Sequence, residues 1–165
     1  MWLCNSSIGR KVVMSVTGVA LILFLTFHMS MNIAALFSGD AYNMICEFLG
    51  ANWYALVATL GLAALAVIHI LYAFWLTMQN RKARGTERYA VTTRPAGVEW
   101  SSQNMLVLGI IIILGLLLHL FNFWYNMMFA ELTGIAVAHA PADGYAYIVD
   151  TFSCPVYVVL YIVWL

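Results

Sequence analysis

Charged residues are scarce in this sequence. Only 8% of its 165 residues are Asp, Glu, Lys or Arg, whereas a typical soluble domain contains about 25%. So few charges cannot cover a water-facing surface. The seven basic and seven acidic residues also cancel, so the chain has no net field that would attract nucleic acid. These shortages exclude a soluble enzyme, a nucleic-acid-binding protein and a disordered tail.

Cysteine is rare as well. The three cysteines, Cys4, Cys46 and Cys154, form neither a CxxC nor a CxxCH motif, which excludes a disulfide framework and covalent haem attachment. What the chain has in abundance is apolar sequence, because 64% of its residues are hydrophobic. The composition therefore indicates an integral membrane protein.

Long uncharged stretches divide the chain into helices. A spanning helix needs about 20 apolar residues to cross the hydrocarbon core, and three stretches reach that length. A fourth apolar run begins near Phe152 and reaches Leu165, and its 14 residues are too few to span. We therefore predict an all-α transmembrane helical bundle that forms one domain over residues 1–165 and is truncated inside its fourth helix. The predicted helices lie at about 12–37, 53–78, 104–129 and 152–165, the last one incomplete.

The basic residues all fall on one side of the predicted bundle. Two precede the first helix and five lie between the second and third, whereas the connections 38–52 and 131–151 contain no Lys or Arg. Cytoplasmic loops carry such an excess of Lys and Arg, so we expect the N-terminus to lie in the cytoplasm. The seven residues are Arg10, Lys11, Arg81, Lys82, Arg84, Arg88 and Arg94.

One histidine lies within each of the three predicted spans: His28, His69 and His119. An ionisable side chain at membrane depth is costly and suggests a functional site. The alternative for each is a neutral imidazole that bonds to a neighbouring helix. The fourth histidine, His139, lies in the connection 131–151, and we expect it to be a solvated loop residue.

Two of these histidines lie at matched depth. His28 precedes Asp40 by 12 residues and His119 precedes Glu131 by 12 residues, and both helices run outward. His69 lies in the helix that runs inward and belongs to a second, inner layer. Two imidazoles that face each other at one depth are what a non-covalent b-type haem requires, because its iron takes neutral imidazole nitrogen on both faces. Such bis-histidine ligation suits electron transfer.

Small residues near these histidines would make room for a porphyrin, although they also serve plain helix packing in membranes. The inner layer contains His69 alone, so we expect its partner from the fourth helix, near positions 167 to 172 and beyond the end of the chain. The small residues are Ala58, Gly61, Ala66 and Ala73 around His69, and Gly115 one turn before His119.

Several motifs, spread over essentially the whole chain, resemble one family. It is the single-chain, di-haem cytochrome b subunit of succinate dehydrogenase and fumarate reductase, in the form found in Bacteroidetes-type bacteria. The motifs are SSIGRK (6–11), MSVTG (14–18), FH (27–28) with Asn32, AYN (41–43), FLGAN (48–52) and HLFN (119–122).

The resemblance implies five membrane helices with two b haems in the bacterial cytoplasmic membrane, docked to an iron–sulphur subunit and a flavoprotein subunit. It implies that His28 and His119 hold the outer haem and that His69 holds the inner one. Family members also use an acidic residue near the outer haem in quinol chemistry. Glu47 is the best-placed candidate for this proton acceptor, with menaquinone or menaquinol as the substrate, and Glu131 is its competitor.

We therefore expect a subunit that carries electrons between a membrane quinone and the soluble subunits. The basic connection 79–104 would form their docking surface, although its charges could serve topology alone. A cytochrome b subunit of a nitrate reductase or hydrogenase is the alternative with the same chemistry. A transporter without haem is disfavoured, because transporter sites show helices broken near the midplane, and Pro95, Pro141 and Pro155 lie in loops or near a helix end. A purely structural anchor is the third class.

Overall fold

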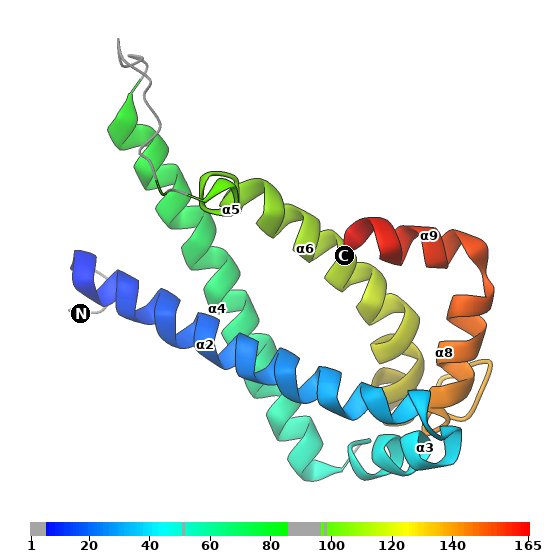
Figure 1. Cartoon of the computed structure of the whole chain (residues 1–165). Coiled ribbons are helices and arrows are strands. Elements are labelled where there is room, and N and C mark those ends of the chain that lie inside the picture. The colour runs from blue at the N-terminus through cyan, green and yellow to red at the C-terminus, as the bar shows by residue number, and fades with distance from the viewer. Residues whose placement is uncertain (1–5, 51, 86–96, 98) are drawn as a thin grey trace.

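The computed structural model describes residues 6–50, 52–85, 97 and 99–165 of the chain (Figure 1). These residues form helices joined by turns and loops, and no strand occurs among them. Three helical segments are long and apolar enough to cross a membrane: Ser7–Leu36, Trp53–Ala83 and Met105–Thr133. The predicted all-helical class is confirmed, and the three predicted spans correspond to helices that are long and apolar enough to cross a membrane.

The first span begins earlier than predicted because hydropathy marks the apolar part of a helix and not its ends. α2 (Ser7–Asn32) begins where the hydroxyl oxygen of Ser6 accepts a hydrogen bond from the Gly9 amide at 2.9 Å. This contact satisfies one of the free amides of the first turn. The helix then tightens into the short 3-10 segment η1 (Ile33–Leu36).

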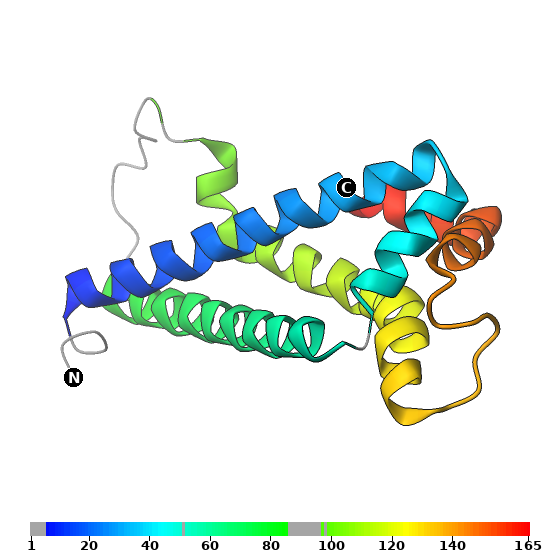
Figure 2. The same ribbon diagram turned by 90° about the horizontal axis from the view of Figure 1, so that it is seen from below.

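The second span, α4 (Trp53–Arg84), runs antiparallel to α2 and packs along it (Figures 1 and 2). The guanidinium of Arg10 donates a hydrogen bond to the side-chain oxygen of Gln79 and lies 5.5 Å from the ring centroid of Trp75. These contacts join the start of α2 to the last turns of α4. α4 ends at Gly85, whose φ of 68° lies in the left-handed region that glycine adopts most readily.

The third span changes its helical geometry along its length. The short α5 (Trp100–Gln103) precedes α6 (Met105–His119), and the chain continues as the π-helix η2 (Leu120–Phe129) and the short α7 (Ala130–Thr133). π-turns are rare and are frequent at functional sites. The geometry changes at His119, one of the predicted ligands.

The fourth helix differs from the prediction. We expected a helix starting near Phe152, but α8 (Gly144–Ser153) already includes this residue, and a separate helix, α9 (Pro155–Trp164), follows it at an angle of 94°. Pro155 causes the break, because proline lacks an amide hydrogen and disfavours a helical conformation in the preceding residue. Cys154 is accordingly extended, with φ −88° and ψ 114°.

The break directs α9 back onto α6, so that α6, η2, α8 and α9 pack together (Figure 1). Trp164 lies against Gly115, where an added Cβ would be 1.8 Å from the indole. The indole also donates a hydrogen bond to the Ile111 carbonyl at 3.1 Å. The Trp164 indole therefore occupies the space beside Gly115. This corrects the expected role of Gly115, which was to leave space for a porphyrin.

At the opposite end from the start of α2, the short α3 (Gly39–Phe48) packs on α8. An added Cβ at Gly144 would be 2.5 Å from Cys46 Sγ and 3.0 Å from the Tyr42 ring. The Tyr42 hydroxyl donates a hydrogen bond to Asn32 Oδ1 at 2.8 Å, which fixes α3 to the end of α2. These contacts hold one compact helical cluster at this end of the molecule.

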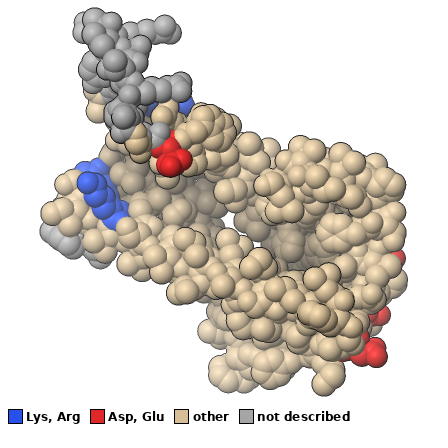
Figure 3. Space-filling model, viewed as in Figure 1, with Lys and Arg blue, Asp and Glu red and all other residues tan. Residues whose placement is uncertain are grey.

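The Lys and Arg side chains of the described residues gather at one end of the molecule and most of the described acidic ones at the other (Figure 3), with Glu99, the N-cap of α5, as the exception. We call the end where α2 begins and α4 ends the basic end, and the end formed by α3, α7 and α8 the acidic end. Most of the apolar side chains between the ends are not covered by protein; Ile22 and Leu23, for example, are 63% and 65% exposed. This is the surface of a protein whose solvent is lipid. Described residues of the basic end are Arg10, Lys11, Arg81 and Lys82, and those of the acidic end are Asp40, Glu47, Glu131, Asp143 and Asp150.

Candidate functional site

The structure brings His28 of α2 and His119 of α6 together. Their ring centroids are 5.7 Å apart and the ring planes are nearly perpendicular, at 89°. Phe24 stacks on His28 with centroids 5.4 Å apart, and Phe123 lies 5.1 Å from His119. Two imidazoles from separate spans thus meet inside an aromatic frame, as their matched depth predicted.

The donor set of this pair fits an axial role for a planar metal cofactor. Imidazole nitrogens bind metals at about 2 Å, so two imidazoles that share one ion have ring centroids roughly 6 Å apart, close to the 5.7 Å observed. The ring nitrogens of His28 and His119 form no hydrogen bond within the described part of the chain. Each imidazole therefore has a nitrogen available as a ligand.

The protein alone does not complete a metal site. The described residues contain no group of three or more His, Cys, Asp or Glu side chains that could hold an ion. A metal between His28 and His119 would need its other ligands from a macrocycle. α2 packs along α4 while α6 packs against η2 and α9, and the molecular surface is hollowed between the α2 and α6 sides (Figure 3).

His69 lies in a separate environment between α2 and α4. Its Nδ1 is 2.8 Å from the hydroxyl oxygen of Thr17, and its Cε1 lies 3.5 Å from an ideal Cβ at Gly18. The Thr17 hydroxyl donates to the Val13 carbonyl at 2.8 Å, so its oxygen is left to accept from the imidazole. This arrangement puts the hydrogen of His69 on Nδ1 and leaves Nε2 as the free ligand atom.

The predicted small residues around His69 have different surroundings. Gly61 faces open space, since nothing lies within 4 Å of an added Cβ, and Ala58 is exposed. Ala66 and Ala73 are partly covered. The α4 stripe thus leaves room beside the helix, in contrast to the filled position on α6.

The predicted acidic residues lie on α3 and α7. Glu47 lies on the exposed side of α3, and Glu131 is exposed on α7. An added Cβ at Gly50 would be 3.1 Å from Glu131 Oε2, so this carboxylate lies beside the end of α3. No contact joins Glu47 to either imidazole within the described structure.

His139 is not the solvated loop residue that we expected. Its Nε2 lies 2.5 Å from Asp150 Oδ2, and its side chain is only 31% exposed. The Tyr147 hydroxyl donates to the His139 carbonyl at 2.6 Å, and the two rings are in edge contact at 5.3 Å. Tyr147 is buried, so the loop is held against α8 and its imidazole is fixed beside a carboxylate.

A polar pocket between η2 and α8 is the feature that our sequence reasoning missed. Its volume is about 280 Å³. Asn122 and Asn126, four residues apart within an apolar span, were the available signal, because amides at membrane depth are costly without partners. The lining residues are Phe121, Asn122, Asn126, Ala138, Tyr147, Asp150, Thr151 and Tyr157.

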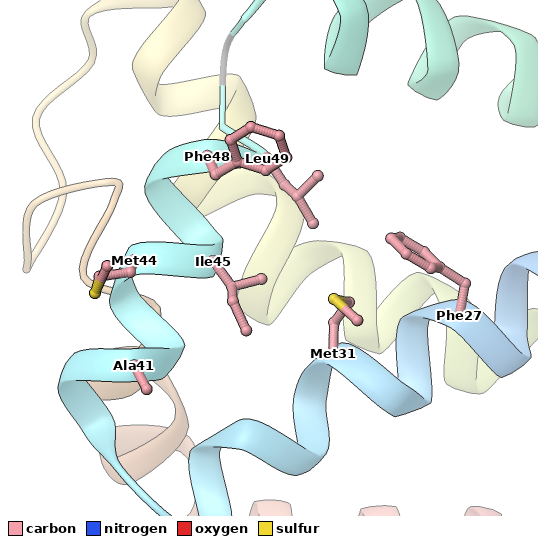
Figure 4. A pocket seen from close by; sticks show the side chains of 7 residues that line it. All are labelled: Phe27, Met31, Ala41, Met44, Ile45, Phe48 and Leu49. Atoms are coloured by element: carbon pink, nitrogen blue, oxygen red, sulfur yellow. The ribbon is translucent and has the colours of Figure 1, made fainter.

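A second, apolar groove of about 440 Å³ lies between α2 and α3 (Figure 4). Met31 of α2 and Ile45 of α3 point toward one another across it. Only carbon and sulfur side chains line this groove, so it has no donor or acceptor that would orient a polar ligand. The lining residues are Phe27, Met31, Ala41, Met44, Ile45, Phe48 and Leu49.

The predicted docking connection 79–104 is described only in part. Arg81 and Lys82 are exposed at the basic end, while Arg88 and Arg94 lie outside the described residues, as does Cys4. The described part therefore contributes an exposed basic turn at the end of α4.

The histidine pair, the Thr17-supported His69 and the polar pocket are thus the three polar features that lie on or between the long apolar helices. Comparison with protein-family models, with curated proteins and with solved structures finds no match for this chain.

Proposed function

We propose that this chain is the membrane-anchor cytochrome b subunit of a succinate:quinone oxidoreductase, a succinate dehydrogenase or fumarate reductase. In this function it carries electrons through b haems between a membrane quinone and the iron–sulphur and flavoprotein subunits. The observation that supports the proposal most is the meeting of His28 and His119 from separate spans, with centroids 5.7 Å apart.

In this proposal a bound haem supplies the one-electron redox chemistry, and the chain supplies ligation, spacing and a dry environment. His28 and His119 would hold this haem through their imidazole nitrogens, and the flanking Phe24 and Phe123 rings restrict the rotation of the imidazoles. Ligation by two imidazoles would suit electron transfer better than oxygen binding.

His69 is the proposed ligand of the inner haem. Its Nδ1 is bound by Thr17, so the ring orientation is set and Nε2 is left as the ligand atom. A metal-binding histidine commonly has such a partner on its other nitrogen.

Orientation and partners belong to the same proposal. The basic end would face the cytoplasm, in accord with the positive-inside rule, and its basic residues would receive the iron–sulphur subunit. Charge reversal at Arg84 and Arg88 should then release the soluble subunits from membranes, and retained subunits would contradict the docking role. Glu47 stays a predicted proton acceptor, supported by its position at the acidic end only.

The test is haem quantification by reduced-minus-oxidised spectra on the detergent-purified complex that contains this chain. His28→Ala and His119→Ala should each remove the same haem signal, whereas His139→Ala serves as the matched control and should keep it. His69→Ala should also leave the signal of the His28–His119 haem. A wild-type protein without haem would refute the proposal.

A further inference from the structure

The pocket between η2 and α8 joins a buried polar end to an exposed acidic end. Thr151 and Asn122 are only 8% and 7% exposed, whereas Asp150 is 62% exposed. Its volume of about 280 Å³ is at the lower end of the range of about 300–1,000 Å³ for small-molecule sites. The pocket therefore suits one compact ring group, with the rest of a larger ligand remaining outside.

The buried end contains polar groups that the protein does not fully use. The Thr151 hydroxyl forms no hydrogen bond within the described part of the chain. Asn122 reaches the Tyr161 hydroxyl only at 3.4 Å. Polar groups at membrane depth are costly without partners, so these two side chains are suited to bind a ligand oxygen.

The exposed end contains an oriented carboxylate. Asp150 lines the pocket and is held by His139 at 2.5 Å. The backbone around His139 is fixed in turn by the buried Tyr147. A ligand hydroxyl at this end can donate to the carboxylate.

Aromatic side chains form the walls between the two ends. Phe121, Tyr147 and Tyr157 line the pocket, and flat rings favour stacking with other flat rings. The pocket also lies close to the histidine pair: Phe123 contacts His119 at 5.1 Å and Phe152, which follows Thr151, at 6.4 Å.

We propose that this pocket binds the headgroup of a quinone or quinol, with one ring oxygen at Thr151 and Asn122 and the opposite one at Asp150. The inference rests on the proposed function for the class of ligand, and on the pocket for the site. It places the ring oxygens at α8 instead of at Glu47, which does not line the pocket.

The test is equilibrium binding of menadione, a soluble naphthoquinone, to the purified full chain in lipid nanodiscs, followed by quenching of intrinsic fluorescence. Thr151→Val should raise the Kd of menadione by roughly three- to tenfold, the loss expected for one hydrogen bond. Asp150→Asn should raise the Kd of menadiol, the reduced form whose hydroxyl can donate to the carboxylate, by a similar factor. Asp40→Asn, which removes an exposed carboxylate at the same end, should leave the Kd unchanged. Ala138→Phe should abolish binding, because it fills the pocket from an exposed loop position.

Melting curves identify any variant that fails to fold, and Ala138→Phe keeps the test decisive because its site is exposed. Unchanged binding in folded Thr151→Val, Asp150→Asn and Ala138→Phe would overturn the inference. Weakened binding in Glu47→Gln alone would overturn it as well, because the headgroup would then lie at α3. Haem content is measured on the same samples, so loss of haem with intact menadione binding refutes the proposed function and not the pocket.

Discussion

Thr17 is the residue through which α2 acts on the histidine of α4. It is buried, donates its hydroxyl hydrogen to its own helix, and accepts from His69. A hydroxyl that bonds back to the preceding turn is common in helices, but here its oxygen also determines which imidazole nitrogen is free. The effect of Thr17 can be measured as the haem affinity of His69.

Thr17→Val should weaken haem binding at His69 by about tenfold or more, because loss of such a supporting partner typically lowers metal affinity by 10–100-fold. Thr17→Ser keeps the oxygen and should restore the affinity. Haem titration of the purified protein, with the redox potential of the same haem as a second readout, checks this. Equal affinity in both variants would show that Thr17 only packs.

Cys46 offers a test of the α3–α8 contact. Burial raises the pKa of its thiol above the usual range, and the nearby Asp143 carboxylate adds to this rise, while hydrogen bonds from Tyr42 and the Gly144 amide oppose it. The thiolate is the reactive form, so a raised pKa means a smaller reactive fraction at neutral pH.

Alkylation of Cys46 by iodoacetamide should therefore be slow at pH 7. Its rate should still increase about tenfold per pH unit beyond pH 8.5, where an ordinary thiol begins to level off. Site-resolved mass spectrometry measures the rate. A plateau near pH 8.5 would mean that Cys46 is solvated and that α3 does not pack on α8.

The histidines could be predicted at this scale, whereas the pocket residues could not. His28 and His119 belong to two continuous apolar spans, so counting residues from the charged ends sets their depth. Asn122 and Asp150 meet only because α8 folds against η2, and that approach depends on the turn after Gly134 and the contacts of Tyr147. Such contacts leave no periodic pattern in a single sequence.

Among the elements, α6 and α9 depend on one glycine. Gly115 gives the Trp164 indole a place against the α6 backbone, and the indole hydrogen bond to Ile111 needs that close approach. Gly109 lies on the same helix with nothing within 4 Å of an added Cβ.

Gly115→Ala should destabilise the protein by about 1–3 kcal/mol, the usual cost of overpacking, and shift the Trp emission because Trp164 must move. Gly109→Ala is the matched control and should be neutral or stabilise by up to about 1 kcal/mol, since alanine favours helix. Denaturant unfolding in detergent compares them. Equal stability of the two variants would contradict the packing of α9 on α6.

The elements themselves were partly predictable. Three spans follow from uncharged length alone, because only a helix can satisfy its backbone in lipid over that distance. The bend between α8 and α9 was not predicted, because the uninterrupted apolar run from Phe152 to Leu165 indicated a single helix. Pro155, which causes the bend, lies within this run. The position of the break, after Ser153, could therefore have been predicted from Pro155. Its angle of 94° could not, because it is set by packing on α6.

For the whole molecule, the gathering of the described Lys and Arg residues at one end is the strongest clue to its orientation (Figure 3). α2 and α4 are antiparallel, so Arg10 and Gln79 meet at one end while Asn32 and Tyr42 meet at the other. The helical arrangement thereby places the basic residues of two distant segments side by side.

This arrangement predicts opposite labelling of two engineered cysteines in a variant whose native cysteines are replaced by serine. A membrane-impermeant maleimide added to intact cells should label Asp40→Cys at the acidic end and not Lys82→Cys at the basic end. Permeabilised cells should label both. The reverse pattern in intact cells would invert the proposed orientation.

The wide turns of η2 have a further consequence for how sequence length is tolerated. The Asn126 amide donates to the carbonyls of Phe121 and Asn122 at 3.1 and 3.0 Å, so the side chain satisfies backbone groups that the π-geometry leaves apart. A π-turn holds one residue more than an α-turn. Deleting a single residue between 120 and 129 would let one wide turn close into an ordinary α-turn, so the helix on either side would keep its orientation. The same deletion in a regular α-helix would rotate everything after it by about 100°. The third span is therefore expected to tolerate the loss of one residue within η2 better than within α6.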